Sequence, residues 1–258
     1  MSNYILLIPD IHGCFDIFIR TLEMAEMLFT GALKVYFGDY VDRGPKSYEV
    51  LEKVMQDVKD GHLALLGNHE YGFIHSTINS YESAFMRVAA STASSNSPES
   101  GYGFTQTIQS FERIHGSKFN SLKEFQAFCA DRGIIDFLKE LPLVYNIENW
   151  VFTHAPLNRN CWINSSETDP LSTIMNRNKD YTDIYATKNR LNACGHQITE
   201  THTPVYIPSK GLYLNCGLGA SKYGRFYIGI LSDFTYIGAV NKEGFLKCEL
   251  PHLNLRLR

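Results

Sequence analysis

The chain opens with an alternation of short apolar runs and segments in which apolar residues recur at helical spacing. Apolar runs at residues 4–8, 34–37 and 63–66 predict β-strands, and the segments 17–29 and 48–58 predict helices between them. Strands that alternate with helices in this way form parallel sheets whose faces the helices cover. The pattern therefore predicts an α/β fold with a mostly parallel, buried sheet.

The pattern changes after residue 71. From there to about residue 103 no period persists, and residues 91–100 form a polar, low-complexity stretch that no core could use. Residues 121–141 return to helical spacing, with Leu122, Phe125 and Phe128 on one face. We therefore predict an insertion over about residues 71–140 that forms a cap of helices and loops.

The rest of the chain is predicted to be mainly β-structure. Strand-like runs occur at residues 143–145, 150–153, 191–194, 212–215, 226–231 and 236–240, and a short helix is predicted after Thr168. The sequence has no internal repeat and no linker that would divide it into two parts. We expect residues 1–258 to form a single domain that carries the inserted cap.

Composition narrows the choice of partners. The chain is 44% hydrophobic and 20% charged, and its formal net charge is −3, so neither nucleic acid nor an anionic membrane is expected as a partner. No apolar stretch approaches the roughly 18 residues that span a bilayer, and the amino terminus lacks the features of a signal peptide. The six cysteines form no C-x-x-C pair. We predict a reduced, cytoplasmic protein.

Polar residues follow five of the apolar runs, at the point where each run ends. They are Asp10, His12, Asp39, Asn68, His154 and His196. Ligand sites of open α/β sheets lie beyond the carboxyl ends of the strands, so these side chains should converge. Two carboxylates, one amide oxygen and three imidazoles suit manganese, iron or zinc better than calcium. Six ligands exceed what one catalytic ion normally takes, so we predict two divalent metal ions, with manganese as the first choice.

Each of these residues also has a purely structural interpretation. A single His at a strand end usually makes a hydrogen bond, and a single Asp there usually caps a helix. Gly38, Gly67 and Gly195 favour the site, because they directly precede three of the polar residues, where close backbone approach is useful. For the other histidines and the cysteines we keep the structural interpretation: His62, His75, His115, His202 and His252, and Cys14, Cys129, Cys161, Cys194, Cys216 and Cys248.

Five short motifs carry a resemblance to a known family. They are Asp10-Ile-His-Gly13, Gly38-Asp-Tyr-Val-Asp-Arg-Gly44, Gly67-Asn-His-Glu70, His154-Ala155 and Gly195-His196. In order and spacing they resemble the signature motifs of the phosphoprotein phosphatase branch of the calcineurin-like metallophosphatases, and most of all its bacterial and phage (lambda phosphatase-like) serine/threonine phosphatases. The resemblance implies central mixed β-sheets, packed as a β-sandwich and flanked by helices.

The resemblance also implies a role for each motif residue. Asp39 would bridge two metal ions, the first held by Asp10, His12 and Asp39 and the second by Asp39, Asn68, His154 and His196. His69, oriented by Asp42, would be the general acid. Arg43 and Arg177 would bind the phosphoryl oxygens of the substrate, with Arg159 and Arg190 as rivals for the role of Arg177.

The predicted reaction is the hydrolysis of phosphomonoesters by direct attack of a hydroxide held between the two metal ions. The main prediction is a protein-serine/threonine phosphatase that acts on phosphorylated proteins or peptides. The alternative is a symmetrical dinucleotide polyphosphate hydrolase or another hydrolase of small phosphoesters, because such enzymes share the five motifs. A further alternative is an inactive metal-binding scaffold, against which the intact His69, Asp42 and Arg43 count.

Overall fold

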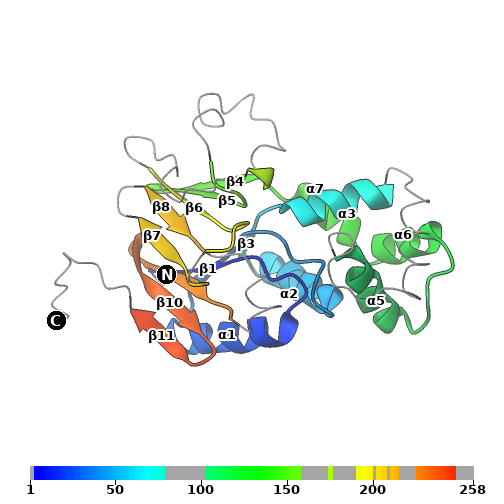
Figure 1. The fold of residues 1–258 in the computed structure, drawn as a ribbon, viewed down its shortest axis with the longest axis horizontal. Helices are drawn as coiled ribbons and strands as arrows, with labels where there is room; N and C mark the ends of the chain where they lie inside the picture. The colour runs from blue at the N-terminus through cyan, green and yellow to red at the C-terminus, as the bar shows by residue number, and fades with distance from the viewer. Residues whose placement is uncertain are drawn as a thin grey trace.

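Two mixed β-sheets form the centre of the fold (Figure 1). The computed structural model describes residues 3–78, 103–157, 174–176, 190–199, 202–207, 210–214 and 225–247. The first sheet has the strand order β11-β10-β9-β1-β2-β3, and the second has the order β4-β5-β6-β8-β7. The expectation of a sheet that is mostly parallel is therefore wrong for the fold as a whole, whereas the mixed sheets implied by the family resemblance are confirmed.

The parallel part of the first sheet comes from the amino-terminal alternation. Its strands are β1 (Tyr4–Ile8), β2 (Leu33–Tyr36) and β3 (Leu63–Ala64), joined by the helices α1 (Phe15–Leu28) and α2 (Ser47–Lys59). Three antiparallel strands extend the sheet on the other side of β1: β9 (Ile228–Ser232), β10 (Thr235–Asn241) and β11 (Gly244–Lys247). The five elements expected from the first apolar pattern are thus present: β1 has the predicted bounds, and the other four differ at one or both ends.

The second sheet comes from the later strands. The hairpin of β4 (Val144–Ile147) and β5 (Trp150–Thr153) is antiparallel, and β5 then pairs in parallel with β6 (Leu191–Cys194). The sheet continues through β8 (Gly211–Tyr213), which is parallel to β6 and antiparallel to β7 (Val205–Ile207). The predicted strand over 212–215 is thus β8, and Asn215 lies outside the described residues.

The side chains of β1 alternate between two cores. Ile5 and Leu7 are packed in the layer between the sheets, with Phe152 and Leu212 of the second sheet. Leu6 and Ile8 belong to the core under the helices. This period of two explains why the strand reads as a continuous apolar run, because both of its faces are buried.

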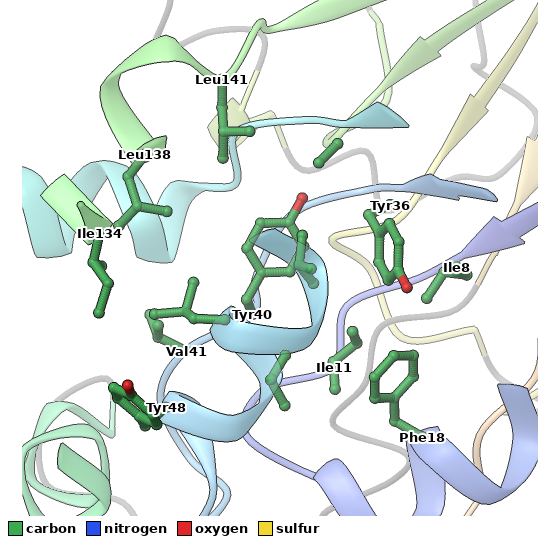
Figure 2. Packing of buried hydrophobic residues seen from close by; sticks show 14 of the residues in the cluster. Ile8, Ile11, Phe18, Tyr36, Tyr40, Val41, Tyr48, Ile134, Leu138 and Leu141 are labelled. Carbon is green, nitrogen blue, oxygen red and sulfur yellow. The ribbon is translucent and has the colours of Figure 1, made fainter. Parts of the chain in front are cut away.

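The hydrophobic core on the helix-covered face of the first sheet extends into the helices of the insertion. These helices are α3 (Asn68–Ile78), α5 (Phe104–His115), α6 (Leu122–Asp131) and α7 (Ile134–Glu140). Figure 2 shows one packed cluster that joins strand, loop and helix residues, among them Ile8, Tyr36, Tyr40, Val41, Leu138 and Leu141. The loop that follows β2 is therefore packed between the sheet and the helices.

Several elements differ from the sequence-based expectation. The stretch after residue 71 lacks a clear period, yet it continues α3, which begins at Asn68. Residues 121–141, expected to be helical, form two helices, because the chain turns at Gly133, whose φ of 67° is left-handed. The strands β7 and β11 and the helix α5 were not predicted. The polar stretch 91–100 and most of the helix expected after Thr168 lie outside the described residues.

Candidate dimetal site

Loops at the ends of five strands bring the predicted polar residues together. Asp10 follows β1, Asp39 follows β2, Asn68 follows β3, His154 follows β5 and His196 follows β6. The first two loops are joined directly, because the N–H groups of Ile11 and His12 both donate to the carbonyl of Asp39, at 3.0 and 2.8 Å. The convergence expected from the strand ends is therefore present in the structure.

Asp39 lies at the centre of the cluster. One of its oxygens, Oδ2, is 3.4 Å from Nε2 of His12, and the other, Oδ1, is 3.4 Å from Nε2 of His154. Two groups of possible metal ligands share this carboxylate: His12, Asp39 and His69, and Asp39, His154 and His196. Burial raises the pKa of Asp39, but the imidazoles of His154, His69 and His12 outweigh burial and hold it below its usual range.

The donor atoms around His154 fit a bound cation. Nδ1 of His154 donates to the carbonyl of Phe37 at 2.6 Å, so the neutral ring carries its lone pair on Nε2. That lone pair faces Oδ1 of Asn68 at 3.0 Å and Nδ1 of His196 at 3.1 Å. Acceptor atoms gathered around one point, with a backbone carbonyl fixing the ring, are the arrangement that a divalent ion requires.

His12 is oriented in the same way. Its Nδ1 donates to the carbonyl of Val41 at 2.9 Å, which leaves Nε2 directed towards Asp39. Burial, the largest effect, lowers the pKa of His12 well below its usual value, so the ring is neutral and able to act as a ligand. His12, Asp39 and His154 are all buried, which keeps water from competing for these atoms.

Asp10 lies outside both ligand groups. Its two oxygens each lie 3.1 Å from the backbone nitrogen of His196, which donates to them. The carboxylate is buried, and a Cβ at Gly195 would collide with it. Asp10 thus fixes the loop that carries His196, and its predicted place as a ligand of the first metal ion stays a prediction.

A second set of residues borders the ligands. Nδ1 of His69 lies 2.6 Å from Oδ2 of Asp42, as the predicted acid pair requires. The Arg43 guanidinium donates to Nε2 of His12 at 3.0 Å and lies 3.2 Å from Nε2 of His69. Burial would lower the pKa of His69, but the carboxylates of Asp39 and Asp42 raise it to about 9. A protonated imidazole is therefore favoured here.

Strained backbone is concentrated in this site. Nine non-glycine residues of the described part of the chain have positive φ, and five of them belong to the site: His12, Asp39, Asp42, Arg43 and His196, with φ from 49° to 71°. Such conformations persist only where surrounding contacts enforce them. A cluster of this kind is typical of a functional site.

Glu70 is a residue whose role at the site sequence reasoning missed. It closes the motif Gly67-Asn-His-Glu70, but the motif does not say what its side chain contacts. Its oxygens accept the N–H groups of Asp39 at 2.7 Å, Tyr40 at 2.8 Å, Val41 at 3.1 Å and Gly67 at 3.2 Å. Burial raises the pKa of Glu70 to about 7, while its bond from Val41 opposes that rise. Glu70 thus holds the loop that presents Asp39.

The glycines before the ligands allow the close approach that was predicted. A Cβ at Gly38 would lie 2.6 Å from the backbone of Gly67 and 2.9 Å from Nδ1 of His154. A Cβ at Gly67 would collide with Asp39. Since atoms do not approach so closely, these positions accept only glycine while the ligands stay in place.

The described residues enclose a cavity of about 200 Å³ over the site. It is lined by Asp39, Arg43, Asn68, His69, His196, Gln197 and Ile198. A phosphoryl group fits such a space, with Arg43 as its cationic wall and Ile198 as an apolar rim.

Of the three arginines proposed as the second phosphate ligand, the structure describes only Arg190. Arg177 and Arg159 lie outside the described residues, and the role of Arg177 stays a prediction. Its neighbour Asn176 donates to the carbonyl of Pro156 at 2.7 Å, two residues after His154. Arg190 donates to Asn146 in an exposed pair, so it is engaged on the surface.

For the other histidines and cysteines that the structure describes, we had kept a purely structural role. His62 accepts the N–H of Lys34 at 3.2 Å, and His75 is exposed on α3. Burial raises the pKa of the thiols of Cys14, to about 11, and of Cys129 and Cys194, so none of these three is a ready nucleophile. No helix in the described ranges is long and apolar enough to cross a membrane.

The fold and the paired groups of possible metal ligands agree with a match to a known protein family. Residues 4–211 match the calcineurin-like phosphoesterase family, a span that covers most of the chain. The protein belongs to the calcineurin-like phosphoesterase family.

Its curated relatives match over a shorter span. The chain is 44% identical over 72 residues to the symmetrical bis(5'-nucleosyl)-tetraphosphatase of Vibrio cholerae, a span that is 27% of this chain and 25% of that protein. It is 38% identical over 74 residues to the enzyme of the same name from Buchnera aphidicola, or 29% of this chain and 26% of that protein. The match thus covers about a quarter of the length of these relatives.

Solved structures share the fold at low identity. The cold-active protein-tyrosine phosphatase of a psychrophilic Shewanella superposes with a TM-score of 0.60 at 15% identity, over 95% of this chain and 79% of that one. A putative diadenosine tetraphosphatase superposes with a TM-score of 0.53 at 15% identity, over 93% and 94% of the two chains. These likenesses support the fold and leave the phosphoprotein phosphatase branch a prediction.

Proposed function

We propose that this protein is a phosphohydrolase of small molecules, with dinucleoside polyphosphates as its substrate class. The observation that carries the proposal is the 44% identity over 72 residues with a symmetrical bis(5'-nucleosyl)-tetraphosphatase. Both curated relatives described above carry that name, so the protein-serine/threonine phosphatase predicted from the motifs becomes the second candidate.

The ligand set fits two divalent ions. Asp10, His12 and Asp39 would hold one ion, and Asp39, Asn68, His154 and His196 would hold the other. When bound, such a pair activates water and polarises the phosphoryl group. Mixed carboxylate, amide and imidazole ligands suit manganese, with iron or zinc as the alternatives.

The chain's own residues would bind and orient the substrate. The Arg43 guanidinium offers a planar fork of donors for two phosphoryl oxygens. In this structure the Arg43 guanidinium contacts Nε2 of His69 at 3.2 Å. When Arg43 binds the phosphoryl oxygens instead, Nε2 of His69 is free to donate a proton to the leaving oxygen. Asp42 holds Nδ1–H of His69 throughout and favours its protonated form. Arg177 remains the proposed second phosphate ligand.

The chemistry of the leaving group separates the two candidates. Symmetrical hydrolysis of a dinucleoside tetraphosphate consumes one water, breaks the central P–O bond and releases two nucleoside diphosphates. A diphosphate leaves readily, whereas the alkoxide of a serine or threonine needs a proton from an acid. The His69–Asp42 pair is the specific observation that favours the second candidate, a phosphomonoesterase acting on phosphorylated proteins or peptides.

Kinetics on three substrates test the proposal. Protein loaded with Mn²⁺ is assayed with diadenosine tetraphosphate, a phosphoserine peptide and p-nitrophenyl phosphate, and the nucleotide products are separated by anion exchange. We expect the highest kcat/KM for the dinucleotide, with two ADP formed for each molecule consumed. A higher value for the peptide would favour the second candidate. If no substrate is turned over with manganese, iron or zinc, the result would favour the inactive metal-binding scaffold.

A further inference from the structure

The helix α5 presents a row of polar residues to the loop that carries Asp42 and Arg43. Thr107, Ser110 and Arg113 are three residues apart and so share one face of the helix. Ser110 accepts the N–H of Tyr48 at 3.0 Å, and Arg113 donates to the carbonyl of Pro45 at 3.1 Å. Thr107, at the start of this row, reaches Asp42 itself.

The hydroxyl of Thr107 makes two bonds to Asp42. It accepts the backbone N–H of Asp42 at 2.8 Å and lies 2.7 Å from Oδ1 of the same residue. Thr107 donates its own hydrogen to Oδ1, because a carboxylate oxygen is an acceptor. Ser47, whose oxygen is 3.2 Å away, then donates to the remaining lone pair of Thr107. The direction of every hydrogen bond in this group is thereby set.

These bonds fix the orientation of the Asp42 carboxylate and of its backbone. Oδ1 is held by Thr107, so Oδ2 is the oxygen that meets Nδ1 of His69 at 2.6 Å. The backbone of Asp42 has a φ of 71°, and its N–H is shared by the oxygens of Thr107 and Ser47. Thr107 therefore fixes both the strained backbone and the rotation of the carboxylate.

The residue before α5 touches the neighbouring arginine. Gly103 has a φ of 88°, and a Cβ there would lie 2.9 Å from Cα and 3.1 Å from Cγ of Arg43. The first turn of α5 therefore packs on Arg43 through Gly103 and on Asp42 through Thr107. Asp42 and Arg43, two of the three residues that border the ligands, are therefore supported from this one helix.

We propose that Thr107 is a positioning residue for the acid pair, acting through Asp42 on His69. The inference rests on the proposed phosphohydrolase function and adds a residue that none of the five motifs contains. Without the hydroxyl, the Asp42 carboxylate is free to rotate, and His69 loses the orientation it needs to protonate a leaving oxygen. The effect should therefore grow with the difficulty of the leaving group.

Two variants at Thr107 isolate the hydroxyl. Thr107→Val keeps the shape and removes the hydroxyl, whereas Thr107→Ser keeps the hydroxyl. With Mn²⁺ bound, we expect Thr107→Val to lower kcat about 10- to 100-fold for a phosphoserine peptide and much less for p-nitrophenyl phosphate, whose leaving group needs no acid. Thr107→Ser should restore most of the rate with the peptide.

A matched control lies one turn further along the same helix. Ser110 is buried and bonded to the Tyr48 N–H, so Ser110→Ala removes an interface hydroxyl without touching Asp42. It should change the rates with the two esters by the same factor. If Thr107→Val does not fold, Thr107→Ala takes its place and is judged by the same ratio of rates.

A double-variant cycle tests whether Thr107 acts through Asp42. In an Asp42→Asn background, Thr107→Val should cause no further substrate-dependent loss. Equal losses with both esters, or no rescue by Thr107→Ser, would overturn the positioning role while leaving the proposed function intact. If the wild-type protein cleaves diadenosine tetraphosphate but neither ester, the positioning role is overturned and the proposed function stands. Failure to cleave all three substrates would overturn the proposed function and, with it, this inference.

Discussion

The carboxylate of Glu70 accepts the backbone N–H of Asp39 at 2.7 Å. The same side chain also accepts the N–H groups of Tyr40, Val41 and Gly67, so one buried group satisfies four donors around the central Asp39. A carboxylate can do this because both of its oxygens are acceptors. An amide in its place would turn its NH₂ group towards backbone N–H groups.

Glu70→Gln should therefore destabilise the fold. Each buried N–H left without an acceptor costs about 1 to 3 kcal/mol, so we expect the free energy of unfolding to fall by about 2 to 4 kcal/mol. Urea denaturation of the metal-free protein measures the change. Glu52→Gln, an exposed substitution on α2, is the control and should have no effect. Unchanged stability of Glu70→Gln would mean that these four bonds contribute nothing.

Removal of metal should abolish activity, and Mn²⁺ should restore it. Because Oδ1 of Asn68 and the imidazole of His154 meet at 3.0 Å, either Asn68→Ala or His154→Ala should also lower the number of bound ions. Metal content after dialysis, measured by atomic emission, gives the stoichiometry. Asn146→Ala, an exposed change on β4, should bind as much metal as the wild type. Two ions retained in both site variants would contradict the ligand assignment.

His69→Asn should separate the acid from the ligands. If His69 protonates the leaving oxygen, the variant should keep its metal content and lose about 10² to 10⁴ in rate with an alkyl phosphate. The loss should be much smaller with p-nitrophenyl phosphate, whose leaving group is stable as an anion. Steady-state rates at equal metal occupancy make the comparison. Equal losses with the two esters would give His69 a different role.

The pH dependence of stability should reflect a second buried cluster, which contains none of the proposed metal ligands. Burial raises the pKa of Asp57, but hydrogen bonds from Lys34, Lys53 and Tyr36 outweigh burial and lower it. Since the folded-state pKa lies below the unfolded value, the stabilisation is present above about pH 4 and is lost as the pH falls through the folded-state pKa.

Asp57→Asn should accordingly cost about 3 to 5 kcal/mol at pH 7, because it leaves the charge of Lys34 buried with one partner fewer. The difference from the wild type should shrink as the pH falls below about 4. Urea denaturation from pH 7 to pH 3 measures it, with the exposed Asp60→Asn as the control. A difference that does not change with pH would show that packing, and not charge, is responsible.

The sequence was most informative where a one-dimensional pattern has a direct spatial consequence. Apolar runs that end in Asp, Asn or His predicted the convergence of Asp10, Asp39, His154 and the others, because parallel strands end at a common edge. Glycines before these residues predicted the close backbone approach seen at Gly38 and Gly67. Neither prediction required knowledge of distant contacts.

Other features depend on contacts between distant parts of the chain. Thr107 and Glu70 are ordinary helix residues in sequence, and only the packing of α5 and α3 on the loop after β2 gives them partners. The left-handed backbone of Asp42 and Arg43 is likewise imposed by its surroundings. The strands β7 and β11 were missed because neither is buried on both faces, and short runs of that kind resemble loops.

The backbone of His196 donates to Asp10 across 186 positions of the sequence. During synthesis the ribosome releases Asp10, His12, Asp39 and Asn68 long before His154 and His196. At ordinary elongation rates of about 5 to 20 residues per second, the nascent chain carries only the first four of the six ligands for roughly 4 to 17 s, and it lacks His196 for roughly 6 to 26 s after Asn68 has been made. This incomplete set lacks the imidazoles of His154 and His196, which follow β5 and β6, so tight metal capture waits until the second sheet has been made and docked on the first.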